Sequence, residues 1–221
     1  MTFIDIHTHN SEVEKDTIKV VNLFPDVFDP LVVPQFASVG LHPWYVKENF
    51  AEQISLLENI ARNNKIIAIG EAGLDKAVKV DFDLQKQVFM VQAKIAEKLS
   101  MPMIIHAVKT YYDLIALRKN FIKAPQWIIH GFNGNEKVAN DLIKNNFYLS
   151  FGKDLLNENK HTCKSISSIP LEKIFFETDA TDLNIRNVYD NAAGILNICV
   201  EKLSTQINNN FQQLFNVDLK Q

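Results

Sequence analysis

The chain has 221 residues, of which 47% are hydrophobic, and its formal net charge is −3. This length and composition suit a substantial core, and with no Pro-, Gly- or Ser-rich linker we expect a single domain over residues 1–221. The acidic balance argues against a broad basic surface for nucleic acid, although a bound cation can supply positive charge to a phosphate-bearing substrate. The two cysteines, Cys163 and Cys199, provide neither a disulfide framework nor zinc-ligand spacing.

Eight short apolar runs predict eight strands. In chain order they lie near 3–9, 17–24, 36–42, 66–71, 102–107, 126–132, 147–151 and 174–179. The clearest helical periodicity covers 81–99, and weaker periodicity predicts helices over 48–63, 110–119, 135–145, 153–167 and 187–203. Strands that are apolar on both faces and separated by helices indicate a parallel sheet with covered faces. The number of strands, eight, favours a (β/α)8 TIM barrel over an open sheet. The first two connections lack a convincing helix, so we expect the barrel to be irregular on that side.

The start of the chain carries no basic and then apolar leader, and no long apolar span occurs further on. We therefore expect a cytoplasmic protein that does not associate with a membrane.

Polar side chains gather where the predicted strands end. The residues that share this position are His7, His9, His42, Glu71, His106, His130 and Asp179. In a parallel barrel the C-terminal ends of the strands form one mouth, so residues far apart in the sequence are expected to converge there. His7 and His9 are two residues apart and therefore project from the same face of the first strand.

Imidazole nitrogens and carboxylate oxygens together form a donor set that suits zinc, manganese or iron better than magnesium. Two neighbouring carboxylates also need a cation between them to stay ionised. The predicted ligands are His7, His9, Glu71, His106, His130 and Asp179. Six ligands divide into two sites with Glu71 bridging, as in two-metal hydrolases. His7, His9 and Asp179 would hold one ion, and His106 and His130 the other.

Six segments resemble the successive signatures of the TatD-type metal-dependent deoxyribonucleases. They are "IDIHTH", "GLHPWYV", "IIAIGEAGLD", "QKQVFMVQAKIAEKLSMPMIIHA", "WIIHGFNGN" and "IPLEKIFFETDATDL", in the family's order between residues 4 and 183. The resemblance implies an irregular, amidohydrolase-like TIM barrel. It also implies a divalent-metal phosphodiesterase that usually acts on DNA, with the same six metal ligands.

The chain departs from the family pattern around these ligands. Val108 stands where an arginine commonly follows, and Asn133 replaces a serine. Thr181 and Asp182 replace a proline and an aromatic residue. No predicted helix follows the first histidine pair. The metal ligands are therefore retained, while the residues expected to grip phosphate are altered.

Asp179 is the predicted general base, because a carboxylate beside the attacking water can accept its proton, and Glu71 shares the catalytic role as the bridging ligand. Asp5 and Glu177 lie on the ligand faces of their strands and are expected to orient ligands from behind. The candidates for holding the substrate are His42, Lys109, Asn133, Lys153 and Arg186. Trp44 and Tyr45 have two interpretations, stacking against a base or packing a loop, and Gln85 and Gln92 are interpreted as helix packing.

The expected function is hydrolysis of phosphodiester bonds by metal-activated water, as a deoxyribonuclease acting on single-stranded DNA or frayed DNA ends. The expected cofactors are two divalent ions, Mg, Mn or Zn, and the expected partner is DNA or another phosphodiester, with no obligate protein partner. One alternative is a hydrolase of a small phosphoester or amide on the same barrel. A second alternative is a non-catalytic metal-binding scaffold.

Overall fold

The structure is a computed structural model that describes residues 1–121, 125–157 and 161–219. Its internal contacts divide the chain into two compact units. Unit 1 comprises Met1–Val20 and His130–Gln221, and unit 2 comprises Val21–Ile129. Strands occur in all eight predicted places, and strand β2, Thr17–Leu23, spans the boundary between the units in the sequence.

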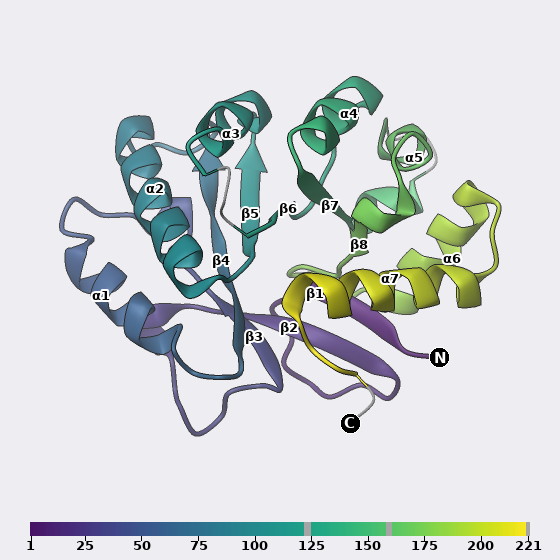
Figure 1. The fold of residues 1–221 in the computed structure, drawn as a ribbon, viewed down its shortest axis with the longest axis horizontal. Coiled ribbons are helices and arrows are strands. Elements are labelled where there is room, and N and C mark those ends of the chain that lie inside the picture. The colour runs from purple at the N-terminus through teal and green to yellow at the C-terminus, as the bar shows by residue number, and fades with distance from the viewer. Residues whose placement is uncertain (122–124, 158–160, 220–221) are drawn as a thin grey trace. The chain divides into compact units, whose positions relative to one another are not determined.

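Unit 2 contains four parallel strands that pair in chain order: β3 Phe36–Val39, β4 Ile66–Asp75, β5 Met103–Val108 and β6 Trp127–Ile129. Its helices are α1 Ala51–Ile60, α2 Phe82–Leu99 and α3 Tyr111–Arg118, and two short 3-10 turns are η1 Pro25–Val27 and η2 Pro43–Tyr45. Helix α2 runs along β4 and packs against it (Figure 1).

Helix α2 shows how the sequence fixes a local element. The side chain of Asp81 caps its first turn by accepting the backbone N–H of Leu84 at 2.8 Å. The helix ends at Ser100, which adopts the left-handed conformation with φ 55°. The buried Phe89 meets Trp127 of β6 with the ring centroids 5.2 Å apart. The apolar stripe predicted for 81–99 is therefore the face that covers the sheet of unit 2.

Unit 1 contains β1 Phe3–Thr8, β7 Phe147–Phe151 and β8 Ile174–Phe176. Strands β7 and β8 pair in parallel, and a parallel bridge joins Thr8 at the end of β1 to Asp179 beyond β8. The remaining elements of unit 1 are α4 Glu136–Lys144, η3 Lys153–Leu156, α5 His161–Ile166, η4 Leu171–Lys173, α6 Ile185–Leu196 and α7 Val200–Phe215. Helix α7 packs on β1 and β8 and lies beside α6 (Figure 1).

Tyr189 of α6 organises the core of unit 1. Its buried ring lies edge-on to Phe3 at 4.9 Å between centroids and 4.6 Å from the ring of Phe176. Its hydroxyl donates to the backbone oxygen of Ile4 and accepts the N–H of the same residue, both at 3.1 Å. A buried phenol needs such partners, and here they tie α6 to β1.

Three sequence predictions need correction. The single helix expected over 187–203 is two helices, α6 and α7, because Asn197 ends α6 in the left-handed conformation with φ 52°. The helix expected over 153–167 is the short η3 and α5, and residues 158–160 lie outside the described part of the chain. Strand β4 continues to Asp75, so Glu71 lies inside the strand and not at its end.

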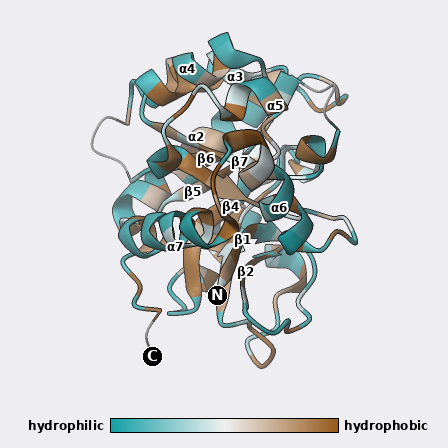
Figure 2. Cartoon of the chain, turned by 90° about the vertical axis from the view of Figure 1, so that its right-hand side faces the viewer, coloured by the Kyte–Doolittle hydropathy of each residue, from teal (hydrophilic) through white to brown (hydrophobic). Residues whose placement is uncertain are grey.

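The irregularity expected near the start of the chain is confirmed, because residues 9–16 contain no helix and residues 24–35 contain only η1. Among the described residues, no helix combines the length and apolar character that crossing a membrane requires. Figure 2 shows strand segments coloured as hydrophobic, whereas much of α6 and α7 is hydrophilic.

Candidate metal centre

Unit 1 brings two histidines to one carboxylate. Nε2 of His7 lies 3.7 Å from Oδ1 of Asp179, and Nε2 of His9 lies 3.6 Å from the same oxygen. These donor atoms all lie within 4.8 Å of one another. We call this group cluster 1. His7 is fully buried, whereas His9 and Asp179 are partly accessible, so the group has a closed side and an open side.

Backbone pairing fixes the position of cluster 1. The N–H of Asp179 donates to the oxygen of His7 at 2.9 Å, and the N–H of His9 donates to the oxygen of Asp179 at 3.1 Å. Asp179 has φ 54°, a left-handed conformation that Asp tolerates better than most residues. The end of β1 and the segment after β8 therefore hold the two histidines and the carboxylate together.

Asp5 of β1 is completely buried two residues before His7, and its side chain bonds to Thr178. The hydroxyl of Thr178 donates to Oδ2 of Asp5 at 2.6 Å, and its backbone N–H donates to Oδ1 at 3.0 Å. Complete burial raises the pKa of Asp5 to about 7, although the bonds from Thr178 oppose the shift. Thr178 precedes Asp179, so this network supports the backbone that carries the carboxylate of cluster 1.

His130 also belongs to unit 1 and lies beside His7, with the ring centroids 4.4 Å apart. Its Nδ1 lies 3.4 Å from Oε1 of Glu177, which also accepts the backbone N–H of Gly131 at 2.7 Å. Burial alone would raise the pKa of Glu177, yet the pKa is lowered, because the hydrogen bond and charge of His130 favour the carboxylate. Glu177 therefore contacts the ring of His130, and its expected role in orienting a histidine stays a prediction.

Unit 2 forms a second group, which we call cluster 2. Nδ1 of His106 lies 2.9 Å from Oε1 of Glu71, and Nε2 of His42 lies 3.1 Å from the same oxygen. The three donor atoms lie within 4.8 Å of one another. The sequence predicted Glu71 and His106 as ligands, but it placed His42 among the residues that contact substrate. The structure instead brings His42 directly to Glu71.

Several supports of cluster 2 were not recognised in the sequence. Asp75 accepts the indole N–H of Trp44 at 2.7 Å and lies 3.2 Å from Nε2 of His106. Burial alone would raise the pKa of Asp75, yet the pKa is lowered by the hydrogen bonds from Trp44, from the backbone of Ala77 and from His106. Asn22 accepts the backbone N–H of Glu71 at 2.7 Å. The sequence did offer a sign of these supports, because Asn22 and Asp75 are polar residues in strands that are otherwise largely apolar.

Gln85 and Gln92 of α2 are buried, but they do more than pack. The amide of Gln92 accepts the N–H of Leu41 at 2.8 Å and donates to its oxygen at 3.0 Å. The amide of Gln85 makes the same pair of bonds to Asp75, at 2.8 and 3.0 Å. The helix thereby fixes the backbone next to His42 and the backbone of Asp75.

The candidates for binding substrate have different surroundings. Lys109, Asn133 and Lys153 are exposed. Arg186 is engaged within unit 1, where it donates to the backbone oxygen of Lys15 at 3.2 Å and its guanidinium lies 4.6 Å from the ring centroid of Phe3. Arg186 therefore holds the loop after β1 in place.

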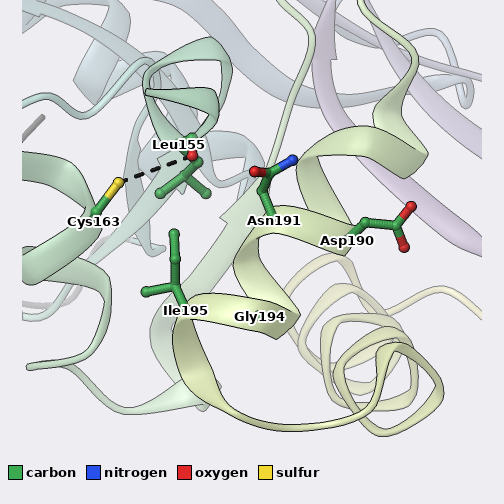
Figure 3. Close-up of a pocket in the computed structure, with 6 residues that line it drawn as sticks. All are labelled: Leu155, Cys163, Asp190, Asn191, Gly194 and Ile195. Carbon is green, nitrogen blue, oxygen red and sulfur yellow. Dashed lines mark hydrogen bonds between the residues drawn. The ribbon is translucent and has the colours of Figure 1, made fainter. Parts of the chain in front are cut away.

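The described residues of unit 1 line hollows that include the following two. One, of about 220 Å³, is lined by residues of the loop after β1, of β2 and of the segment after β8, among them Asn10 and Thr178, the sequence neighbours of His9 and Asp179. The other, of about 490 Å³, lies between η3, α5 and α6, with Cys163 and Ile195 facing each other across it (Figure 3). None of the predicted site residues lines the larger hollow, so it is separate from cluster 1.

The donor chemistry of both clusters fits a divalent cation. In cluster 2 a ring nitrogen and a carboxylate oxygen lie 2.9 Å apart, a distance that needs a proton or a metal ion between two acceptors. Each cluster combines imidazole nitrogens with a carboxylate oxygen, the mixed donor set typical of zinc and manganese sites.

Comparisons with known proteins agree with this chemistry. A model of the TatD-related DNase family matches residues 13–216. The uncharacterized metal-dependent hydrolase YabD of Bacillus subtilis is 28% identical over 202 residues, covering 83% of this chain and 78% of the relative. An uncharacterized metal-dependent hydrolase of Buchnera aphidicola subsp. Baizongia pistaciae is 31% identical over 196 residues, covering 81% of this chain and 74% of the relative.

The crystal structure of the TatD homologue YjjV from Escherichia coli matches with a TM-score of 0.86 and 22% identity over 98% of both chains. A TatD-family hydrolase from Entamoeba histolytica matches with a TM-score of 0.77 and 15% identity, over 97% of this chain and 98% of the other. These likenesses confirm the expected fold, an irregular TIM barrel of eight parallel strands with helices between them. The chain belongs to the TatD-related DNase family and is related over most of its length to metal-dependent hydrolases.

Proposed function

We propose that this chain hydrolyses phosphodiester bonds with divalent metal ions and acts as a deoxyribonuclease on single-stranded DNA or frayed DNA ends. The observation that carries the proposal is the pair of clusters, in each of which imidazole nitrogens converge on one carboxylate oxygen, in a member of the TatD-related DNase family. The proposed ligands are His7, His9, Glu71, His106, His130 and Asp179. We predict that Glu71 bridges the two ions. We also predict that residues 1–221 form a single domain.

Divalent ions, when bound, supply a nucleophilic water at neutral pH and neutralise charge on the phosphoryl oxygens. A side chain of the protein accepts the proton that the attacking water loses. Oδ1 of Asp179 faces His7 and His9, and we assign Oδ2 as the atom that accepts the proton of the attacking water. As water adds to phosphorus its proton passes to Asp179, the bond from phosphorus to one ester oxygen breaks, and that oxygen takes up the proton and leaves as the alcohol.

Single strands suit this chain better than duplex. Extended duplex binding depends on many Lys and Arg contacts to phosphate, and the net charge here is −3. In unit 1, Arg186 holds the loop after β1, and Lys19 pairs with Glu14 at 2.5 Å. A flexible strand end needs fewer phosphate contacts to reach the ions. Among the described residues Cys163 and Cys199 form no disulfide, which suits a reducing compartment, so we place the enzyme in the cytoplasm.

Arg186 and Lys19 are both engaged within unit 1, which also favours one alternative, a hydrolase of small phosphoesters or amides with the same metal ligands. A small substrate presents one phosphate or none, so it requires no cationic groove. The scaffold alternative has less support, because Glu71 and Asp179 are both retained.

The test uses purified full-length protein, stripped with a chelator and reloaded with Mn²⁺, Mg²⁺ or Zn²⁺. Labelled single-stranded and duplex oligonucleotides, bis(p-nitrophenyl) phosphate, p-nitrophenyl phosphate and an anilide are compared as substrates. We expect single strands to be cleaved faster than duplex, and chelator to abolish the reaction. Intact oligonucleotides together with cleavage of a small phosphoester or the anilide would overturn the nuclease assignment but keep the hydrolase. No cleavage of any substrate would favour the scaffold.

A further inference from the structure

Trp44 of η2 hydrogen-bonds to His42 of cluster 2 and to Asp75, the carboxylate that contacts His106. Its backbone N–H donates to Nδ1 of His42 at 3.2 Å, and its indole Nε1–H donates to Oδ2 of Asp75 at 2.7 Å. The same oxygen of Asp75 lies 3.2 Å from Nε2 of His106. The indole ring also stands edge-on to the ring of His42, with the centroids 5.1 Å apart. A single residue thus reaches the two imidazoles that face Glu71.

The first contact decides the tautomer of His42. A backbone N–H can only donate, so Nδ1 of His42 accepts and the neutral ring carries its proton on Nε2. That Nε2 lies 3.1 Å from Oε1 of Glu71, where its N–H donates to the carboxylate. Binding of an ion at Nε2 would require either an imidazolate or loss of the bond from Trp44. His42 is therefore arranged to hold Glu71.

The second contact decides which nitrogen of His106 faces the ion. Asp75 is buried, its Oδ2 accepts the indole N–H of Trp44 at 2.7 Å, and its Oδ1 accepts the backbone N–H of Ala77 at 2.7 Å, so both oxygens act as hydrogen-bond acceptors. A carboxylate only accepts, so Nε2 of His106 carries a proton toward it. The lone pair on Nδ1 is then directed at Oε1 of Glu71, 2.9 Å away. A metal ion between them, or a second proton on the ring, makes this approach favourable.

We propose that Trp44 is a positioning residue of the metal centre. Through Asp75 it assigns Nδ1 of His106 to the ion, and through its backbone it keeps His42 as a hydrogen-bond partner of Glu71 and not as a ligand. The proposal rests on the proposed function in taking His106 and Glu71 as metal ligands. It gives a half-exposed tryptophan, with 51% of its surface accessible, a role other than stacking on a base.

Surrounding contacts make this arrangement rigid. Asp75 is 2% exposed, and its backbone is held on both sides by the amide of Gln85. Its second oxygen, Oδ1, accepts the N–H of Ala77 at 2.7 Å. Because Asp75 cannot rotate freely, loss of the indole donor leaves its Oδ2 to His106 and water alone. Outer partners of this kind typically change metal affinity by about 10–100-fold when they are removed.

The first experiment measures zinc affinity and histidine tautomers in the full-length protein. Trp44→Phe keeps the ring and the backbone N–H but removes the indole donor, and the matched control is Tyr45→Phe in the same turn. We expect Trp44→Phe to weaken zinc binding by about 10–100-fold and Tyr45→Phe to leave it unchanged. In zinc-loaded wild-type protein, long-range ¹⁵N–¹H spectra of the imidazoles should show zinc on Nδ1 of His106 and a proton on Nε2.

Three results would overturn the proposal: zinc on Nε2 of His106, wild-type zinc affinity in Trp44→Phe, or loss of one zinc per chain in His42→Ala. If wild-type protein binds no zinc at all, the proposed function fails separately. The spectra of the metal-free protein then decide the proposal. A protected Nε2–H on His106 that is lost in Trp44→Phe would support it, and an Nδ1–H tautomer or no change in Trp44→Phe would refute it.

Discussion

The hydroxyl of Thr178 donates to the carboxyl of Asp5 at 2.6 Å, in a fully buried position where the pKa of Asp5 is raised to about 7. The unfolded chain loses this proton near its ordinary value of 3.8, whereas the folded metal-free protein keeps it up to about pH 7. The native state therefore binds more protons across this window, and the free energy of unfolding should fall as pH rises through it. The full contribution is of order 4 kcal/mol.

Asp5→Asn removes the titrating group and keeps an oxygen that accepts from Thr178. Urea unfolding of chelator-treated protein between pH 4 and pH 7 should give the variant a flatter dependence of stability on pH than wild type. Asp83→Asn, in an exposed carboxylate that is 81% accessible, is the control and should follow wild type. Parallel curves for Asp5→Asn and wild type would contradict the prediction.

Asp179→Asn tests the proton acceptor of the proposed reaction. Asn tolerates the left-handed conformation at φ 54° as well as Asp does, so the variant should fold normally. Turnover should fall by roughly 10²–10⁴, the usual share of a general base. Initial rates on a labelled single-stranded oligonucleotide measure the loss, with circular dichroism to check the fold. Asp190→Asn on the exposed side of α6 is the matched control, and an active Asp179→Asn enzyme would argue that Asp179 is not the base.

Glu71→Gln separates a bridging ligand from a ligand of one ion. The substitution keeps an oxygen that accepts from Nε2 of His42 but removes the negative charge. If Glu71 bridges, calorimetric titration with Mn²⁺ or Zn²⁺ should show weaker binding of both ions. Weakening of one ion alone would restrict Glu71 to cluster 2, and unchanged stoichiometry and affinity would remove it from the ligand set. Glu58→Gln in α1, whose carboxylate pairs with Lys98 and Arg62, serves as the control.

Two glycines of the chain should respond oppositely to alanine. Gly73 of β4 pairs with His106 of β5, and a Cβ there would collide with the backbone oxygen of His106. Gly73→Ala should therefore lower the free energy of unfolding by about 1–3 kcal/mol. Gly194 of α6 has open space around the added Cβ, so Gly194→Ala should raise stability by about 0.5–1 kcal/mol. Urea denaturation measures both free energies of unfolding. Equal changes in the two variants would show that β4 and β5 can move apart at little cost in stability.

The sequence by itself determined the parts that depend on local periodicity and on residue type. Alternation placed His7 and His9 on one face of β1, and Asp179 lies within 4 Å of both imidazoles. The apolar stripe and Asp81 defined α2 almost to the residue. Eight apolar runs gave the barrel class, because buried parallel strands read as short apolar segments between helices.

The tertiary structure alone decided which polar groups pair. Gln85 and Gln92 read as packing in a helical pattern, yet their amides bind the backbones of Asp75 and Leu41. A backbone partner leaves no mark in a sequence, because every residue type carries the same amide. His42 was expected at the substrate and Trp44 at a base or in loop packing. His42 bonds to Glu71, and Trp44 bonds to Asp75, because the short 3-10 turn η2 places their rings there. The periodicity of the sequence does not encode the position of such a turn.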